Sequence, residues 1–424
     1  MKSSPAFTPN LNVPTKKKRI TFVVNSITKK GGTELYVRST ILALQEIGIE
    51  CQVIITSLDD DDVRFMKTHH IPHLLLDRLA GDSKNPSKIR QTYQQSILAQ
   101  DFIFHNQSNI VIIHCYSPNF GMLMKSISRK VKTILFVHTP TFTCPAGGRY
   151  LPHSERFCES VPGLSCFITN QKEACISINF NGRLPLSYVP DVVFFRSKMQ
   201  RFLTYFDKIV ANSSDTLEEL RKLYDLPQTS IVHPPLIPGS LIGLTRNETY
   251  STDFRKLIFI GRLERYKGCK DALQVLASLP KDYTLDIYGS GSEEIPLKNL
   301  ATQLGIEDRI RWHGWVSQEA VFHGLSQSMI CLVPSKGVET FGQIGPQAIF
   351  FGNIVIAYDS GGIKDWCTPD VGSLVPVGNW CEMSKQVLIW TEKIQEGYQI
   401  PYHRIDQWRA GRFVEDIKKC ILSI

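Results

Sequence analysis

Short apolar runs alternate with helix-like stretches twice along this chain, and no other feature limits its fold as strongly. Apolar runs of this kind are typical of buried parallel strands that helices cover on both faces. Between the two series, residues 227–253 are rich in Pro, Ser, Thr and Gly, as expected of a linker. We therefore predict an α/β protein of two doubly wound halves. The strands that we expect are 20–24, 51–56, 110–115, 133–138, 209–211, 256–260, 285–288, 310–313, 330–333 and 354–358.

These patterns also predict the boundaries of the parts. Open parallel sheets bind ligands beyond the carboxyl ends of their strands, so the two halves should face each other across a cleft that holds the active site. A last helix at 407–422 could cross back to the first half. The expected parts are a basic leader (1–19), an N-terminal Rossmann-like domain (20–230) with a Cys-rich insertion (140–180), a linker (231–255), a C-terminal Rossmann-like domain (256–400) and a C-terminal segment (401–424).

The segment 334–362 carries the clearest chemical signal. Gly345-Pro346 opens a short helix, where a proline in the first turn costs no hydrogen bond, and Gly352 closes the helix before an apolar strand. Backbone N–H groups at such a helix N-terminus can hold a phosphate. The carboxylate of Glu339, in the loop before the helix, can hold hydroxyls. A phosphate site next to a carboxylate suits a nucleotide-sugar.

The same segment resembles the signature of the retaining family 4 glycosyltransferases, which have the GT-B fold. That signature reads P-S-x-x-x-E-x-F-G, then a second Glu eight residues after the first, then a later G-G. Gln347 stands where the second Glu is expected. The resemblance is strong over 258–377 and loose over 20–212. The matching residues are Pro334, Ser335, Glu339, Phe341, Gly342, Gly361 and Gly362.

The resemblance implies that the C-terminal domain binds the nucleotide-sugar and that Glu339 lies beside the donor sugar. Phe341, Gly342 and Gln343 would offer backbone N–H groups to the sugar or the phosphate. The second Glu of the family binds the nucleotide ribose. Gln347 keeps an acceptor oxygen there but loses the charge, which should weaken donor affinity about five- to tenfold.

Cations are needed wherever a nucleoside diphosphate departs, because about two negative charges develop on it. Arg262 and Lys267 match the family's G-R-x-x-x-x-K-G element, whose cations contact the diphosphate; ordinary surface charges are the alternative. Gly31 and Gly32 precede a helix, and in the family such a pair lies at the donor phosphates, although a plain turn is also compatible. Gly289 belongs to a G-S-G that lies near the donor in the family.

His138 ends the apolar strand at 133–138 and matches the family His near the C6 hydroxyl of the sugar, at the acceptor edge. A core or capping histidine is the alternative. Retaining transfer in this fold is usually read as a same-face process in which the departing phosphate takes the proton of the acceptor. On that view, His138 positions the sugar and does not titrate.

Two groups of residues could suggest a metal, and neither fits well. The aspartate run at 59–62 reads as a solvated loop. The cysteines of the insertion are spaced 14, 8 and 9 residues apart without a C-x-x-C pair, a poor match to zinc sites. We expect free or buried thiols, with structural zinc as the alternative, no cofactor and metal-independent catalysis. These cysteines are Cys144, Cys158, Cys166 and Cys175.

The formal net charge of +8 favours an anionic partner. Residues 192–202 interleave bulky apolar residues with cations, as at a membrane surface or in an ordinary packed helix. We find no apolar run of about 18 residues and no secretory signal. We therefore expect a cytoplasmic location, with peripheral contact at the anionic inner face of the membrane as a further hypothesis.

The favoured function is a retaining glycosyltransferase that moves a sugar from a nucleoside diphosphate donor to a saccharide or lipid-linked saccharide, in the biosynthesis of cell-surface polysaccharide or glycoconjugate. A non-catalytic sugar-nucleotide-binding homologue is an alternative that Gln347 would favour. An epimerase on the same fold would convert donor without acceptor. Charge alone favours nucleic acid, and because the chain carries no recognised nucleic-acid module, we expect no such partner.

Overall fold

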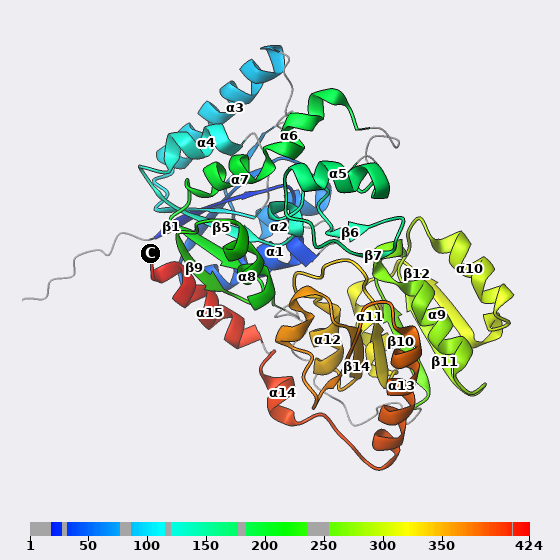
Figure 1. The fold of residues 1–424 in the computed structure, drawn as a ribbon. Helices are drawn as coiled ribbons and strands as arrows, with labels where there is room; N and C mark the ends of the chain where they lie inside the picture. The colour runs from blue at the N-terminus through cyan, green and yellow to red at the C-terminus, as the bar shows by residue number, and fades with distance from the viewer. Residues whose placement is uncertain are drawn as a thin grey trace, which may run out of the picture.

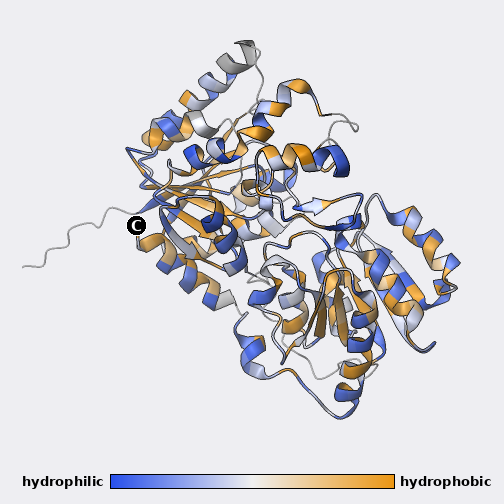
Figure 2. Ribbon diagram, viewed as in Figure 1, coloured by the Kyte–Doolittle hydropathy of each residue, from blue (hydrophilic) through white to orange (hydrophobic). Residues whose placement is uncertain are grey.

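Two parallel sheets flanked by helices make up most of the structure (Figure 1). Figure 2 shows hydrophobic strands inside each half and hydrophilic residues on the outer faces of the helices, which is the pattern expected of sheets covered on both sides. None of the helices in the described part of the chain has the length and hydropathy needed to cross a membrane. The computed structural model describes residues 18–27, 32–76, 86–114, 120–176, 184–235, 254–408 and 410–424.

The first sheet has seven parallel strands in the order β3-β2-β1-β4-β5-β8-β9. The order reverses between β1 and β4, and such a switch point opens a crevice at the carboxyl ends of the strands. The strands are β1 (Arg19–Val24), β2 (Glu50–Ile55), β3 (His73–Leu75), β4 (Ile110–Ile113), β5 (Lys132–Val137), β8 (Lys208–Ala211) and β9 (Gln228–Ile231), and the helices are α1 (Gly32–Glu46), α2 (Asp60–Thr68), α3 (Pro86–His105), α4 (Phe120–Ile127) and α8 (Ser214–Leu223).

The second sheet has six parallel strands in the order β12-β11-β10-β13-β14-β15, with its switch point between β10 and β13. The strands are β10 (Lys256–Ile260), β11 (Thr284–Tyr288), β12 (Ile310–Gly314), β13 (Ile330–Val333), β14 (Ile354–Tyr358) and β15 (Gly372–Val375), and the helices are α9 (Cys269–Ser278), α10 (Glu294–Gln303), α11 (Gln318–Ser326), α12 (Ile344–Phe350) and α13 (Trp380–Gln395).

Within its described residues, an insertion between β5 and β8 forms a small antiparallel hairpin and three α-helices. The hairpin lies on the side of the first half that faces the second (Figure 1). Its elements are β6 (Tyr150–Leu151), β7 (Arg156–Phe157), α5 (Leu164–Glu173), α6 (Val189–Val193) and α7 (Phe195–Leu203).

The chain returns to the first half at its C-terminal end, through α14 (Tyr402–Asp406) and α15 (Ala410–Leu422). The buried face of α15 joins the core of the first sheet and packs against α1. Lys208 of β8 is buried there, and its ammonium donates to the carbonyl of Cys420 at 2.9 Å and to the hydroxyl of Ser423 at 2.7 Å. The apolar side chains of α15 in this core are Phe413, Ile417, Cys420 and Ile421.

Two expectations for the first half are wrong. The aspartate run at 59–62 is not a solvated loop: Asp59 caps the N-terminus of α2, and Asp62 is buried, where it accepts the backbone N–H of Ile27 at 2.9 Å. The segment expected to be a linker begins too early, because its residues 228–231 form the edge strand β9. Residues 236–253 and residues 1–17 lie outside the described part of the chain.

Candidate active site

A cavity of about 1820 Å³ lies between the two halves, at the carboxyl ends of their strands. Its lining comes from the loops after β5, β10, β11, β12 and β13, from the N-terminus of α1 and from the insertion. Gly31 lies outside the described residues. The other residues expected in a donor or acceptor site all line this one cavity: Gly32, His138, Arg262, Lys267, Gly289, Glu339, Phe341, Gly342, Gln343 and Gln347.

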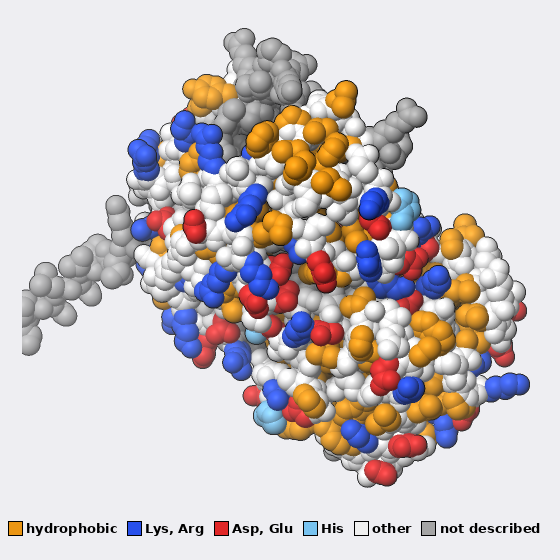
Figure 3. Space-filling view, viewed as in Figure 1, with side chains coloured by type: hydrophobic (Ala, Val, Ile, Leu, Met, Phe, Trp, Pro, Cys, Tyr) orange, Lys and Arg blue, Asp and Glu red, His pale blue; other side chains and the backbone are white. Residues whose placement is uncertain are grey.

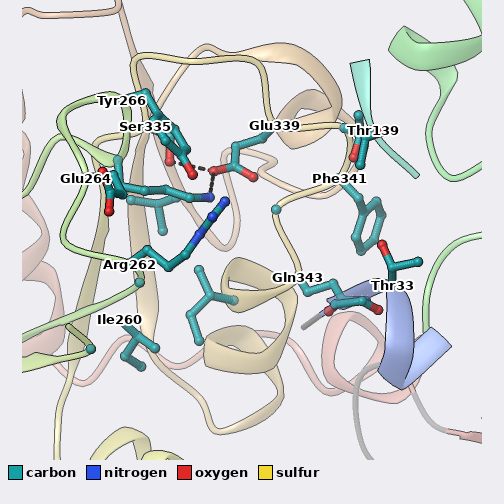
Figure 4. A pocket seen from close by; sticks show the side chains of 18 of the residues that line it. Thr33, Thr139, Ile260, Arg262, Glu264, Tyr266, Ser335, Glu339, Phe341 and Gln343 are labelled. Carbon is teal, nitrogen blue, oxygen red and sulfur yellow. Dashed lines mark hydrogen bonds and ion pairs between the residues drawn. The ribbon is translucent and has the colours of Figure 1, made fainter. Parts of the chain in front are cut away.

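Glu339 lies on the wall that the second half contributes (Figure 4). Its Oε1 accepts from Lys267 Nζ at 2.5 Å and from Ser335 Oγ at 2.6 Å. Burial raises the pKa of the Glu339 carboxyl, but Lys267 and Ser335 lower it more, so this pKa lies below its ordinary value. The side chain is therefore a held, negatively charged group that can accept hydrogen bonds from hydroxyls.

Arg262 and Lys267 form the cationic part of the same wall. Figure 4 shows Arg262 pointing into the cavity towards Glu339. Its guanidinium lies 5.4 Å from the centre of the Tyr266 ring, and the ammonium of Lys267 lies 5.7 Å from that centre. The aromatic ring attracts and orients both cations, so their charge faces the space that a ligand would fill.

Glycines bring the loops of this wall into close contact. Gly268 has a φ of +72°, and a Cβ there would lie 1.9 Å from the carbonyl oxygen of Pro334. A Cβ on Gly345 would lie 2.0 Å from the ring of Trp366, whose Nε1 donates to the carbonyl of Phe341 at 2.5 Å. Only glycine permits either contact, so the glycines fix the shape of the loop that carries Glu339.

The first half forms the opposite wall and is bonded to the Glu339 loop. Thr340 Oγ1 donates to the carbonyl of His138 at 2.7 Å and accepts from Asn212 Nδ2 at 3.1 Å. Gln343 Nε2 donates to the carbonyl of Gly32 at 3.4 Å, which places it beside the start of α1 (Figure 4). Residues far apart in the sequence thus meet around one space.

His138 is a partly buried, neutral side chain at the cavity. Burial lowers its pKa to about 3, so the imidazole carries no charge near pH 7. Its Nε2 lies 2.8 Å from Nδ1 of His114, at the end of β4. The neutral ring agrees with a positioning role and is a poor fit to a base that titrates near neutrality.

Several residues of the cavity were not anticipated. Trp315 and Val316 follow β12, and the Trp315 side chain is 49% exposed at the cavity. Tyr150, from β6 of the insertion, lies opposite Tyr266, with ring centres 6.3 Å apart. An aromatic residue two positions after an expected strand was the available signal for Trp315. Tyr150 gave no such signal, because its position depends on how the insertion folds.

The cysteines of the insertion are free thiols that lie near one another. Cys144, Cys158 and Cys166 are buried, whereas Cys175 is partly exposed and lines the cavity. Burial, followed by the neighbouring cysteines, raises the pKa of Cys175 to about 12. In the described ranges, no group of three or more His, Cys, Asp or Glu side chains has an arrangement that could hold a metal ion.

Two family descriptions match most of the chain between them. Residues 30–237 match the family described as Glycosyltransferase Family 4, and residues 245–397 match the family described as Glycosyl transferases group 1. The chain therefore belongs to the family 4 glycosyltransferases. Its two Rossmann-like halves make the GT-B fold, as expected from the sequence.

Curated relatives are glycosyltransferases of several kinds. An uncharacterized glycosyltransferase of Haemophilus influenzae is 34% identical over 150 residues, 34% of this chain and 38% of the relative. The D-inositol 3-phosphate glycosyltransferase of Mycolicibacterium smegmatis is 28% identical over 204 residues, which are 45% of this chain and 47% of the relative. The lipopolysaccharide 1,6-galactosyltransferase of Escherichia coli is 24% identical over 252 residues, which are 57% of this chain and 68% of the relative. The matches span less than half the length of the first two relatives.

Solved structures share the fold over nearly the full chain. The lipopolysaccharide outer core galactosyltransferase WaaB superposes with a TM-score of 0.64 at 18% identity, over 96% of this chain and 99% of that one. HepE of Anabaena in complex with UDP gives a TM-score of 0.67 at 14% identity, over 96% of this chain and 100% of HepE. The pneumococcal O-GlcNAc transferase GtfA in complex with UDP and GlcNAc gives a TM-score of 0.66 at 12% identity, over 96% of this chain and 99% of GtfA.

Proposed function

We propose that this glycosyltransferase is a retaining enzyme that moves a sugar from a nucleoside diphosphate donor to a hydroxyl of a saccharide or lipid-linked saccharide. The observation that carries the proposal is the charge arrangement on one wall of the cavity. Two cations, Arg262 and Lys267, lie beside the anionic Glu339. Cations would hold a diphosphate, and a carboxylate would hold the hydroxyls of its sugar.

In our proposal, the transfer takes place on one face of the donor sugar. The bond between the anomeric carbon and the diphosphate oxygen breaks, and the acceptor oxygen bonds to that carbon on the same face. The departing phosphate oxygen takes the proton of the acceptor hydroxyl. Arg262 and Lys267 stabilise the charge that develops on the diphosphate, so we propose that no metal ion is required. Closure of the two halves around the donor would exclude water.

Uridine diphosphate sugars are the donors that we place first. The fold neighbours HepE and GtfA were solved with UDP, which supports this choice by fold resemblance. In our proposal, the backbone at the N-terminus of α12 and the glycines Gly32 and Gly289 surround the phosphates. Gln347, buried at the cavity, accepts a hydrogen bond from the ribose.

Calorimetric titration with UDP-, GDP- and ADP-sugars tests the donor site. We expect one nucleotide class to bind saturably to the wild type, with EDTA leaving its affinity unchanged. Arg262→Ala should weaken binding at least tenfold, about 1.4 kcal/mol. Arg311→Ala is the matched control, because this exposed arginine lies on β12 and does not line the cavity. If no class binds, the donor site is lost, and a scaffold or partner-binding role replaces the proposed enzyme.

A lipid-linked acceptor is supported by an exposed apolar surface on the insertion. Figure 3 shows hydrophobic side chains gathered over α6. Leu164, Ile168, Leu186 and Phe194, from the segments around α5 and α6, are each more than half exposed. Cosedimentation with vesicles that contain anionic lipid should pull down the wild type at low salt. Phe194→Asp should bind several-fold less, and no binding by the wild type would refute membrane contact.

A further inference from the structure

His114 shares a hydrogen bond with His138, a residue that lines the cavity. Nδ1 of His114 and Nε2 of His138 are 2.8 Å apart, the ring planes differ by 9°, and the ring centres are 5.1 Å apart. Rings stacked face to face would keep their atoms roughly 3.5 Å apart or more. The rings therefore meet edge to edge, along the direction of a ring lone pair or N–H.

The surroundings of His114 are apolar on both faces. The ring lies between Phe136, with centres 4.6 Å apart, and Phe22, with centres 5.7 Å apart. Tyr36 packs edge-on against His138 at 4.7 Å. His114 is 3% exposed, and burial, followed by His138, lowers its pKa well below the ordinary value. Both imidazoles are thus neutral, and each has one N–H and one bare nitrogen.

Only one direction of the His114–His138 hydrogen bond is compatible with the surroundings of the second ring nitrogen of His114, Nε2. Its Nε2 is buried and has no hydrogen-bond partner among the described residues. If His138 donated, His114 would carry its own proton on Nε2, as a buried N–H without an acceptor. Unpaired buried N–H groups are rare, whereas acceptors without a donor are better tolerated. His114 therefore carries its proton on Nδ1 and donates it.

We infer that His114 is a positioning residue that fixes the tautomer of His138, so that His138 presents an Nδ1–H donor to the sugar. Nε2 of His138 is occupied as the acceptor of the His114 proton. Among the described residues, none is seen to bond Nδ1 of His138, and His138 lines the cavity. An N–H fixed at this place recognises a hydroxyl oxygen of the sugar and does not exchange protons with it. The inference rests on the proposed function for the identity of the ligand only.

The test compares three variants with the wild type. His114→Phe keeps an aromatic ring between Phe22 and Phe136 but removes the donor. His114→Asn restores a donor near the position of Nδ1. Phe22→Leu is the matched control, since it disturbs the packing of His114 and leaves its hydrogen bond in place.

Nitrogen NMR of ring-labelled histidine reads the tautomer without any activity. The chain has 11 histidines, and the His138 signals are assigned by their loss in His138→Gln. We expect His138 to be protonated on Nδ1 and bare on Nε2 in the wild type, in His114→Asn and in Phe22→Leu. His114→Phe should show a mixture of tautomers. A wild-type His138 protonated on Nε2 would overturn the inference.

Kinetics supplies the second readout. We expect kcat to fall about three- to tenfold in His114→Phe, the range of one neutral hydrogen bond, and to recover in His114→Asn. The affinity for free UDP, which lacks the sugar, should not change. An equal loss of kcat in Phe22→Leu would assign the effect to packing and overturn the inference. If no variant binds any donor, the proposed function fails, while the NMR result still decides the tautomer.

Discussion

Lys267 and Glu339 form an ion pair in the wall of the cavity. Lys267→Met leaves the mostly buried carboxylate without its cation, so we expect the free energy of unfolding at pH 7 to fall by about 3 kcal/mol. Urea denaturation measures this difference. The double variant Lys267→Met/Glu339→Gln is the control, because it removes both charges and should recover most of the loss.

The loss of unfolding free energy in Lys267→Met should depend on pH, and the sign of that dependence is defined. In the wild type, the pKa of Glu339 is held below its ordinary value, so its stabilising effect is present above the unfolded pKa and is lost as pH falls through the folded pKa. In Lys267→Met, burial acts without the cation and raises that pKa, so the variant loses stability as pH rises. The difference between the two proteins should therefore grow from pH 4 to pH 7. A difference independent of pH would contradict this account.

Gln347 offers a gain-of-function test at the same scale. Gln347→Glu introduces the carboxylate that the family signature carries at this position. A charged acceptor binds a hydroxyl more strongly than a neutral one, so donor affinity should rise about five- to tenfold. Calorimetry measures the affinity, and Gln303→Glu, which adds the same charge in α10 away from the cavity, is the control. Unchanged affinity would mean that position 347 does not contact the ribose.

Residues that line the cavity could be anticipated from the sequence where they belong to a loop after an expected strand. Arg262, Gly289 and Glu339 are of this kind, because the carboxyl ends of parallel strands meet at one edge. His114 also ends a strand, yet it was missed, since its importance depends on β4 lying beside β5. Strand order in a sheet is a long-range property that local patterns do not encode.

At the scale of elements, the β6–β7 hairpin links the insertion to the second half. Lys336, in the loop after β13, bonds Asp271 of α9 at 2.9 Å and Glu155 of the hairpin turn at 3.0 Å. The backbone N–H of Val338 donates to the carbonyl of Gly148 at 3.4 Å. The Lys336 ion pairs therefore connect the core of one half to the surface of the other.

The two ion pairs of Lys336 should differ strongly in strength. Asp271 is buried, so Lys336→Met leaves a buried carboxylate that keeps, among the described residues, the hydroxyl of Tyr358, and we expect a loss of about 3 kcal/mol. Glu155 is partly exposed, and Glu155→Gln, which leaves the Lys336–Asp271 pair intact, should cost less than about 1 kcal/mol. Urea denaturation of the two variants side by side tests the contrast. Equal losses would show that the interdomain contact carries the stability.

Strands that are short apolar runs in the sequence were predicted closely, whereas an element that depends on tertiary polar contacts was not. The strands β10, β13 and β14 have the expected bounds. The helix α2 was missed, because its start is an aspartate run that looks solvated in the sequence. Its Asp62 is buried only because backbone N–H groups and the hydroxyl of Ser26 converge on it, a tertiary contact that composition does not reveal.

At the scale of the whole molecule, α15 makes the stability of the first half depend on the end of the chain. Ile417 is fully buried in the core that α15 shares with α1 and the first sheet. Ile417→Ala removes methyl groups from a packed core and should lower the free energy of unfolding by about 3 kcal/mol, within the usual range for such a change. Lys418→Ala, at the exposed neighbouring position, is the control and should change it by less than about 0.5 kcal/mol.

The part of the structure that Ile417→Ala destabilises shows whether the two halves unfold as separate units. The buried contacts of Ile417 belong to the core of the first sheet and not to that of the second. Hydrogen exchange measured by mass spectrometry should therefore rise in β1, β2 and α1 of Ile417→Ala and stay unchanged in β10, β11 and β13. An equal rise in both sheets would mean that contacts across the cavity, such as those of Thr340 and Lys336, join the two halves into one cooperative unit.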